Sequence, residues 1–381
     1  MIRIIAGLSN AAISAYYYPY SDALSFHKQG IEEFNLLLHQ PGEYLTNIFH
    51  TNYTDYSGFL ESSNSFWNDL RTNIIAKALS IFDLFSGQNF FINTLFFDFL
   101  IFFGAVYFWK AFIKIFPNHS WAIIVCFFLL PSVLYFTNGI HRDGLIYLSL
   151  GIVIYHFQAG IYNKFSFRKI GAIILFLSFI LLLRNFVFIT LIPAMIAWWL
   201  AEHLRKYPFL SFIYIYVLVI ILFFSSALLP SRFNLPQHVV IKQMEFIELG
   251  KRGASSMDIR QLHPNVLSFT QNAPQALDHA LLRPYFIEKL NFLYTPLAIE
   301  LLCYEVLIFL FVFFRIKNQL GPAVYFCLFF GLSMLLVIGY TIPILGAIVR
   351  YRSIYFPFLL LPIICLTDWD RISKLFKINK K

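Results

Sequence analysis

Residues 208–229 read PFLSFIYIYVLVIILFFSSALL, a run without a charged side chain. A transmembrane helix needs about 20 mostly apolar residues in succession, so this segment is predicted to cross a membrane. Comparable runs recur along the 381-residue chain, which is 59% hydrophobic and only 13% charged. They predict ten spanning helices, at 3–19, 88–109, 120–137, 144–160, 170–184, 186–201, 208–229, 293–314, 321–341 and 351–368.

The predicted fold is all-α, a polytopic transmembrane bundle of about ten helices, with residues 1–381 forming a single integral membrane domain. Two long segments, 20–87 and 230–292, interrupt the spans. They contain amphipathic stretches at 69–85 and 239–249, each of which predicts a helix on the membrane surface. The first span is short, and a cleaved signal sequence is the alternative there.

Lysine and arginine are distributed unevenly between the two sides of this predicted bundle. Cytoplasmic loops carry an excess of both residues, and that excess sets the orientation of a membrane protein. The pattern predicts an integral cell-membrane protein with both termini cytoplasmic and both long segments outside. The predicted short outer segments contain Arg142, Arg184, Arg350 and Arg352. The predicted inner segments contain Arg3, Lys110, Lys114, Lys164, Arg168, Lys169, Arg205, Lys206, Arg315, Lys317, Arg371, Lys374, Lys377, Lys380 and Lys381.

The net charge of +9 follows largely from that cytoplasmic bias, so no nucleic-acid partner is predicted. The Lys-rich C-terminal residues suit anionic membrane lipids as partners. The four cysteines lie in apolar runs without CxxC spacing, and the histidines lack the spacing of metal ligands. No disulfide, metal or other cofactor is predicted, and a divalent ion stays an open alternative.

Charged residues near the outer ends of the predicted helices form the candidate site. Charge at a helix end in lipid costs several kcal/mol unless it is paired or lines a wet cavity, so such a ring usually marks a site. Asp22 opens the first outer segment, and a carboxylate there can act as general base on an acceptor hydroxyl. His27 is predicted to orient Asp22 or to contact phosphate. The alternative is structural, because Ser21 and Asp22 are both good N-cap residues.

Arginines dominate the rest of this ring. Guanidinium groups offer planar, bidentate donors that suit a phosphate, which is the role predicted for Arg350 and Arg352. Arg142 and Asp143 lie in a tight predicted turn, where an interfacial salt bridge is the alternative. The further predicted substrate-binding residues are Arg184, Arg283 and Glu300, of which Glu300 is placed to pair with an arginine. The stretch 141–144 also matches the start of a kinase catalytic loop, but no Gly-rich phosphate loop accompanies it.

The chain resembles the GT-C superfamily of integral-membrane glycosyltransferases. The resemblance rests on an acidic residue soon after the first helix, an amphipathic helix in the first outer segment, about ten spans and the outward arginines. Locally, 64–71, 131–143 and 346–352 look like bacterial membrane proteins of exopolysaccharide or cell-envelope type. The superfamily often carries an acidic pair in its first outer loop, whereas here Asp22 stands alone in the expected place.

The resemblance implies a glycosyltransferase of the bacterial inner membrane that uses a polyprenyl-phosphate- or polyprenyl-diphosphate-linked sugar donor. Its acceptor would be a glycan, a lipid or a protein, and the arginines would stabilise charge on the departing phosphate. An O-antigen-type polymerase or ligase is the nearest alternative. A transporter or flippase and a non-catalytic envelope scaffold are alternatives from other classes.

Overall fold

A computed structural model describes residues 1–18, 20–51, 53, 65–204, 207–251, 255–285, 295–316 and 320–377. These residues form helices joined by turns and no β-strand, which confirms the all-α class. Contacts between Cα atoms divide the chain into two compact units, and the expected single domain stays a prediction. Unit 1 consists of 1–111 and 128–188, and unit 2 consists of 112–127 and 189–381.

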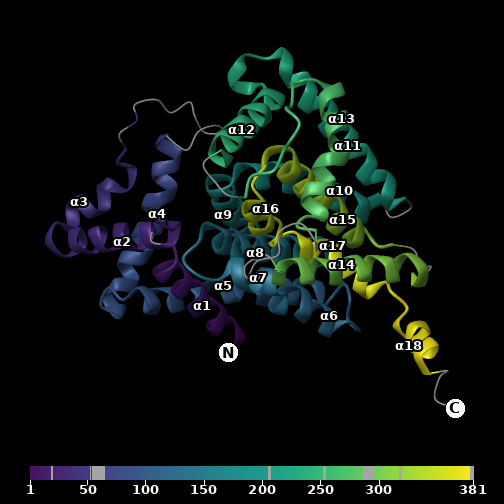
Figure 1. The fold of residues 1–381 in the computed structure, drawn as a ribbon, viewed down its shortest axis with the longest axis horizontal. Coiled ribbons are helices and arrows are strands. Elements are labelled where there is room, and N and C mark those ends of the chain that lie inside the picture. The colour runs from purple at the N-terminus through teal and green to yellow at the C-terminus, as the bar shows by residue number, and fades with distance from the viewer. Residues whose placement is uncertain are drawn as a thin grey trace. The chain divides into compact units, whose positions relative to one another are not determined.

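Unit 1 is built around two helix pairs, α2 with α4 and α8 with α9 (Figure 1). A third close approach joins α5 to α8, because both helices carry glycine where their backbones meet. A Cβ atom added at Gly151 would lie 2.5 Å from the carbonyl oxygen of Gly104. Small residues allow such backbone contact between membrane helices. The helices of unit 1 are α1 Ile2–Tyr16, α2 Asp22–His39, α3 Pro41–Thr46, α4 Phe66–Ser86, α5 Phe90–Phe112, α7 Pro131–Thr137, α8 Arg142–Asn163 and α9 Phe167–Leu183.

Unit 2 is centred on α15, which packs against α11, α12, α13 and α17. Its core contains the fully buried rings of Phe326, Phe330 and Phe358. The helices are α6 Ser120–Ile124, α10 Asn185–Leu204, α11 Pro208–Ser225, α12 Leu235–Gly250, α13 Val266–Leu281, α14 Thr295–Phe314, α15 Pro322–Thr341, α16 Leu345–Arg352, α17 Phe356–Cys365 and α18 Trp369–Lys377. Short helical turns occur at Asn47–Phe49, Val125–Leu129, Ser226–Leu228 and Ser231–Phe233.

Six helices among the described residues are long and apolar enough to cross a membrane, or eight if each of two bent pairs is one span. These helices fit an integral membrane protein, but the predicted count of ten is not confirmed. The predicted spans 3–19 and 170–184 correspond to α1, with 15 residues, and α9, with 17. Both are shorter than the roughly 20 residues that a span needs.

The predicted spans 120–137 and 351–368 correspond to the two bent pairs. The first bends by 45° before Pro131, and the second bends by 55° between α16 and α17. Proline has no backbone N–H and cannot continue the hydrogen bonding of a preceding helix, which accounts for the first break. Pro357 takes the corresponding place at the start of α17.

The two amphipathic stretches are helical, as α4 and α12. The location of α4 on the membrane surface stays a prediction, but α4 does not present one polar face to solvent. It packs along α2, and the side chain of Lys77, which the sequence places on the polar face, is only 11% exposed. Meanwhile Phe85, from the predicted apolar stripe, is 76% exposed.

Arg3 is buried, so it is not an exposed cytoplasmic anchor. Its guanidinium donates to the side-chain oxygens of Asn138 and Tyr147, each at 3.4 Å, and its carbonyl accepts from the Asn138 amide at 3.3 Å. Asn138 belongs to a turn predicted outside, which places the start of α1 beside that turn. The cytoplasmic N-terminus, Arg205, Lys206, Lys317, Lys380 and Lys381 stay predictions, and these last five residues lie outside the described ranges.

Cysteine labelling tests the orientation. In a variant without the four native cysteines, we expect Ser256→Cys to react from outside in intact cells and Ser166→Cys to react only after permeabilisation. Both positions are exposed. Ile2→Cys tests the N-terminus separately: the predicted cytoplasmic N-terminus requires that it react only after permeabilisation, as Ser166→Cys does. The reverse pattern at positions 256 and 166 would place the candidate site on the cytoplasmic face.

Candidate functional site

Three arginines of unit 1 gather near the start of α8. Arg142 is the first residue of α8, Arg184 directly follows α9, and Arg71 lies near the start of α4. Burial, followed by the charges of Arg142 and Arg184, lowers the pKa of Arg71 from 12.5 to about 10. Three like charges are therefore close enough to interact, and we call Arg71, Arg142 and Arg184 the arginine cluster.

Asp143 supplies the carboxylate of this region. Its Oδ1 lies 2.8 Å from Nη2 of Arg184, and the two side chains are 1% and 13% exposed. Asp143 stands in the first turn of α8, where the helix dipole favours a negative charge. Asp143 thus forms a salt bridge with Arg184, and its location at a membrane interface stays a prediction.

Arg142 is held by uncharged groups from two other helices. Its Nη1 donates to Oδ1 of Asn68 at 3.1 Å, and its Nη2 donates to Oγ1 of Thr72 at 2.9 Å. Its guanidinium carbon lies 5.3 Å from the centroid of the Phe26 ring. α2, α4 and α8 thus fix this guanidinium in one place, as an anion-binding group requires.

Arg71 is not among the residues predicted from the sequence, because it lies in the amphipathic stretch 69–85 and not at the end of an apolar run. A signal was present in the spacing of the α4 residues. Asn68, Arg71 and Thr72 are three and four residues apart, so they share one helix face. A polar face this close to the start of a helix can reach a charged neighbour instead of solvent.

Asp22 lies in the first turn of α2, where its side chain is exposed. Oγ of Ser21 accepts from the backbone N–H of Leu24 at 3.5 Å, so Ser21 is the N-cap. Phe26, which contacts Arg142, follows Asp22 by about one helical turn. The structure therefore places Asp22 one turn of α2 from a residue that contacts the arginine cluster.

His27 occupies a different environment, inside unit 1. Its ring lies against Phe90, and its Nδ1 is 3.3 Å from Nδ2 of Asn93. The same Asn93 amide donates to Oδ1 of Asp83 at 2.6 Å. Burial lowers the pKa of His27, which outweighs the opposing effect of the Asp83 charge. A phosphate could reach this ring only by displacing packed side chains.

The remaining four predicted residues lie in unit 2. Arg352 is buried, and its Nη1 donates to the carbonyl oxygens of Ala280, at 3.0 Å, and of Arg283. Ala280 belongs to the last turn of α13, so Arg352 satisfies a carbonyl that the helix leaves open. Glu300 accepts from the Tyr304 hydroxyl, and its charge is close enough to interact with Arg352.

Arg283 and Arg350 are the other two predicted site residues in unit 2. Nε of Arg283 lies 4.0 Å from Oδ2 of Asp278, and its guanidinium carbon lies 5.4 Å from the Tyr285 ring centroid. The Tyr285 hydroxyl donates to Asp278 at 2.5 Å, and this bond is the main cause that raises the pKa of Tyr285. Arg350 stands in the last turn of α16. The charged residues expected to form one ring thus belong to both units: Arg142, Asp143 and Arg184 to unit 1, and Arg283, Glu300, Arg350 and Arg352 to unit 2.

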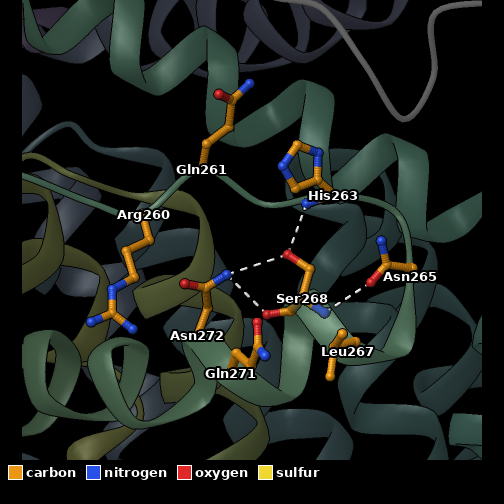
Figure 2. A pocket seen from close by; sticks show the side chains of 8 residues that line it. All are labelled: Arg260, Gln261, His263, Asn265, Leu267, Ser268, Gln271 and Asn272. Carbon is orange, nitrogen blue, oxygen red and sulfur yellow. Dashed lines mark hydrogen bonds between the residues drawn. The ribbon is translucent and has the colours of Figure 1, made fainter.

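Unit 2 also contains a pocket of about 310 Å³ where the segment before α13 meets the start of that helix (Figure 2). Its lining includes Arg260, His263 and Gln271, and Leu267 is the single apolar lining residue. No sequence motif pointed to this pocket, because its residues are ordinary polar residues of a predicted loop.

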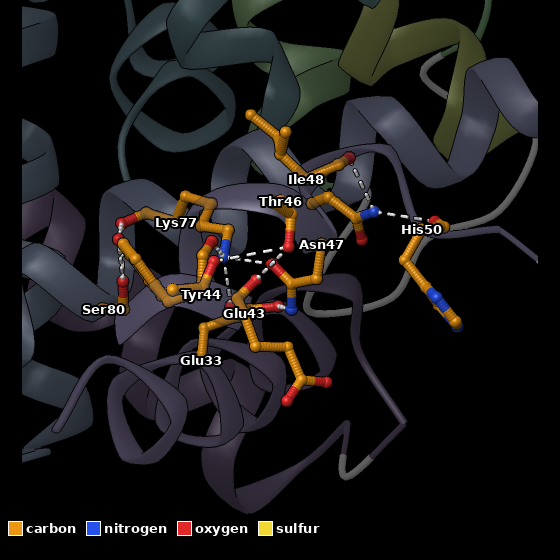
Figure 3. Close-up of polar contacts among 11 residues, drawn as sticks. Glu33, Glu43, Tyr44, Thr46, Asn47, Ile48, His50, Lys77 and Ser80 are labelled. Carbon is orange, nitrogen blue, oxygen red and sulfur yellow. Dashed lines mark hydrogen bonds and ion pairs between the residues drawn. The ribbon is translucent and has the colours of Figure 1, made fainter. Parts of the chain in front are cut away.

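A polar cluster around Lys77 ties α2 and α3 to α4 (Figure 3). Nζ of Lys77 lies 2.6 Å from Oε2 of Glu33 and also donates to the carbonyl of Tyr44 and to Oδ1 of Asn47. The Tyr44 hydroxyl is 2.9 Å from Oγ of Ser80. These contacts are internal to the helix group, which assigns Glu33 and Lys77 to the support of α2 and α4.

Across the described residues, no group of three or more His, Cys, Asp and Glu side chains is arranged to hold a metal ion. The chain matches no protein-family model, no curated protein and no solved structure.

Proposed function

We propose that the chain is an integral-membrane glycosyltransferase that uses a polyprenyl-phosphate- or polyprenyl-diphosphate-linked sugar donor at the extracytoplasmic face. Its product would be an envelope polysaccharide or glycoconjugate. The observation that carries this proposal is the arginine cluster. Arg71, Arg142 and Arg184 are close enough to interact, at the end of a helix that is long enough to span a membrane.

A phosphate group fits this cluster on electrostatic grounds. A phosphate among these three positive charges would add an attraction to the one that Asp143 already supplies. The start of α8 adds backbone N–H groups and the positive end of a helix dipole. Guanidinium groups also keep their charge in apolar surroundings, as a lipid phosphate near the membrane requires.

The same arrangement suits group transfer. When the sugar leaves, negative charge develops on the phosphate, and donors already held in place stabilise that charge. Asp22, near the arginine cluster through Phe26, is the proposed general base that takes a proton from the acceptor hydroxyl. In this transfer the acceptor oxygen bonds to the anomeric carbon while the carbon–oxygen bond to phosphate breaks, and the proton of the acceptor hydroxyl goes to Asp22.

The experiment uses purified protein in proteoliposomes with a radiolabelled polyprenyl-phosphate-linked sugar and an acceptor extract from the envelope. We expect Asp22→Asn to bind donor normally and to slow transfer by about 10²–10⁴-fold, because the amide cannot act as a base. Glu32→Gln is the matched control, since Glu32 is exposed on the same helix. Glu33→Gln is unsuitable because it would also disturb Lys77.

Full transfer by Asp22→Asn would remove that residue from the mechanism, and absence of transfer by the native protein would contradict the proposed function. A polymerase or ligase would use the same donor site with another acceptor.

Transport of a lipid-linked or anionic solute is a second candidate, favoured by one observation. Asp98, in the candidate span α5, is 4% exposed, and its Oδ1 accepts from the Gly139 N–H at 2.6 Å. An ionisable residue within a membrane span is a functional hypothesis by default. Movement of the labelled lipid between leaflets without sugar transfer, in the same proteoliposomes, would favour this candidate.

A further inference from the structure

The pocket at the start of α13 has a lining that suits a saccharide. Small-molecule pockets measure about 300–1,000 Å³ and are usually mostly apolar. This one, at about 310 Å³, is lined by polar side chains with the exception of Leu267. Gln261 and Gln271 carry exposed amides, which offer both donors and an acceptor, as sugar hydroxyls do, whereas the buried Asn272 amide donates to Ser268. The polar lining residues therefore offer hydrogen-bonding partners to a polyol.

The charges of the lining residues also restrict the charge of the ligand that the pocket can bind. Arg260 and His263 are its ionisable members, and none of the eight lining residues is an aspartate or glutamate. A neutral saccharide would meet no opposing charge, and a uronate-containing one would gain an attraction to Arg260. A cationic ligand would be disfavoured.

The backbone beneath the pocket is held by a buried glutamine. Gln243 is fully buried, and its Nε2 donates to the carbonyl oxygens of Arg260, at 3.1 Å, and Tyr340, at 2.8 Å. Its Oε1 accepts from the N–H of Leu262 at 2.8 Å. The Gln243 side chain thus connects the segment before α13 to α15 through hydrogen bonds. Leu262, in the same segment, is fully buried.

Further hydrogen bonds fix both ends of this segment. Oε1 of Gln275 accepts from the N–H of Arg260 at 3.0 Å. Oγ of Ser268 accepts from the N–H of His263 at 3.0 Å, and Oδ1 of Asn265 accepts from the N–H of Ser268 at 2.8 Å (Figure 2). A loop that is ordered before binding loses less entropy when a ligand arrives.

The side chains that this backbone presents are exposed. Gln261, His263 and Gln271 all face solvent. The backbone contacts are thus internal, while the side-chain amides and the imidazole are directed outward. A binding site needs this division, because the groups that hold the loop are not those that meet the ligand.

We propose that this pocket binds a saccharide and that, in the native reaction, this saccharide is the acceptor glycan. The acceptor role rests on the proposed function, whereas saccharide binding can be measured without it. The segment belongs to 230–292, which is predicted to lie outside, where an envelope glycan would be found.

The test uses the full-length protein in lipid nanodiscs and calorimetric titration with maltotriose, trigalacturonate and inorganic phosphate as separate probes. The variant His263→Ala/Gln271→Ala removes two exposed side chains, and Thr270→Ala is the matched control on the same helix. We expect at least one trisaccharide to bind the native protein and to bind the double variant about tenfold or more weakly. The control should bind it as the native protein does, and all three proteins should unfold at the same temperature.

Three outcomes would overturn the proposal: no trisaccharide binds, the double variant binds like the control, or phosphate alone binds. Donor-lipid binding, measured in the same nanodiscs, separates the two proposals. Saccharide binding at the pocket without donor binding would contradict the proposed function and leave a glycan-binding site. Donor transfer without saccharide binding would contradict this inference alone.

Discussion

Arg142→Ala should weaken the binding of a polyprenyl phosphate to the protein by about 30-fold or more. Truncating one partner of a buried, hydrogen-bonded charge pair costs about 2–5 kcal/mol, and 1.4 kcal/mol corresponds to tenfold. Arg142→Lys should recover only part of the loss. It keeps the charge, but an ammonium lacks the planar fork whose two Nη atoms separately reach Asn68 and Thr72.

The measurement is a titration of nanodisc-embedded protein with a short-chain polyprenyl phosphate. Arg168→Ala is the matched control, because it removes an exposed arginine at the start of α9. Arg71→Ala should weaken binding as well, and it tests the residue that the sequence pattern did not identify. Native affinity in both Arg71→Ala and Arg142→Ala would show that the arginine cluster does not bind the donor.

Asp143→Asn should lower the free energy of unfolding by about 3–5 kcal/mol. Breaking a buried ion pair by removing one partner leaves the other charge uncompensated, and Asp143 is almost fully buried beside Arg184. The double variant Asp143→Asn/Arg184→Gln should be less destabilised than the sum of the single variants, because it removes both charges together.

Denaturant unfolding in detergent, followed by tryptophan fluorescence, measures these differences. Lys242→Gln is the control, because its ion pair with Glu245 is about one-third exposed on each side and should contribute at most about 1 kcal/mol. Additive effects of Asp143→Asn and Arg184→Gln would mean that the two charges are not coupled in the folded protein.

The long apolar helices could be predicted from the sequence because membrane spans are recognised by length and composition, which need no tertiary information. α11 and α15 match their predicted ranges closely. α1 and α9, with 15 and 17 residues, stay predicted spans, because their lengths lie near or below the lower limit for crossing a membrane while many of their apolar side chains are exposed. The burial of Arg3 is a tertiary fact, set by Asn138 and Tyr147 far along the chain.

The candidate site was predictable only in part, for a similar reason. Arg142, Asp143 and Arg184 were identified because charges stand out at the ends of apolar runs. Arg352 stands out equally, yet its guanidinium caps α13 through the carbonyl of Ala280. The sequence records that a charge is present near the membrane, but the partner that decides its role comes from a distant segment.

The contact between Gly104 and Gly151 has a consequence for how the site can move. Two helices whose backbones touch cannot slide past each other without a side chain meeting a backbone atom. α8 therefore keeps its height relative to α5, and Arg142 and Asp143 keep a constant depth. Under the proposed function, release of the product would then require displacement of α4 or of the segment after α9, which carry Arg71 and Arg184. The proposed anion site would open by movement of α4 and of the segment after α9, while α8 stays in place.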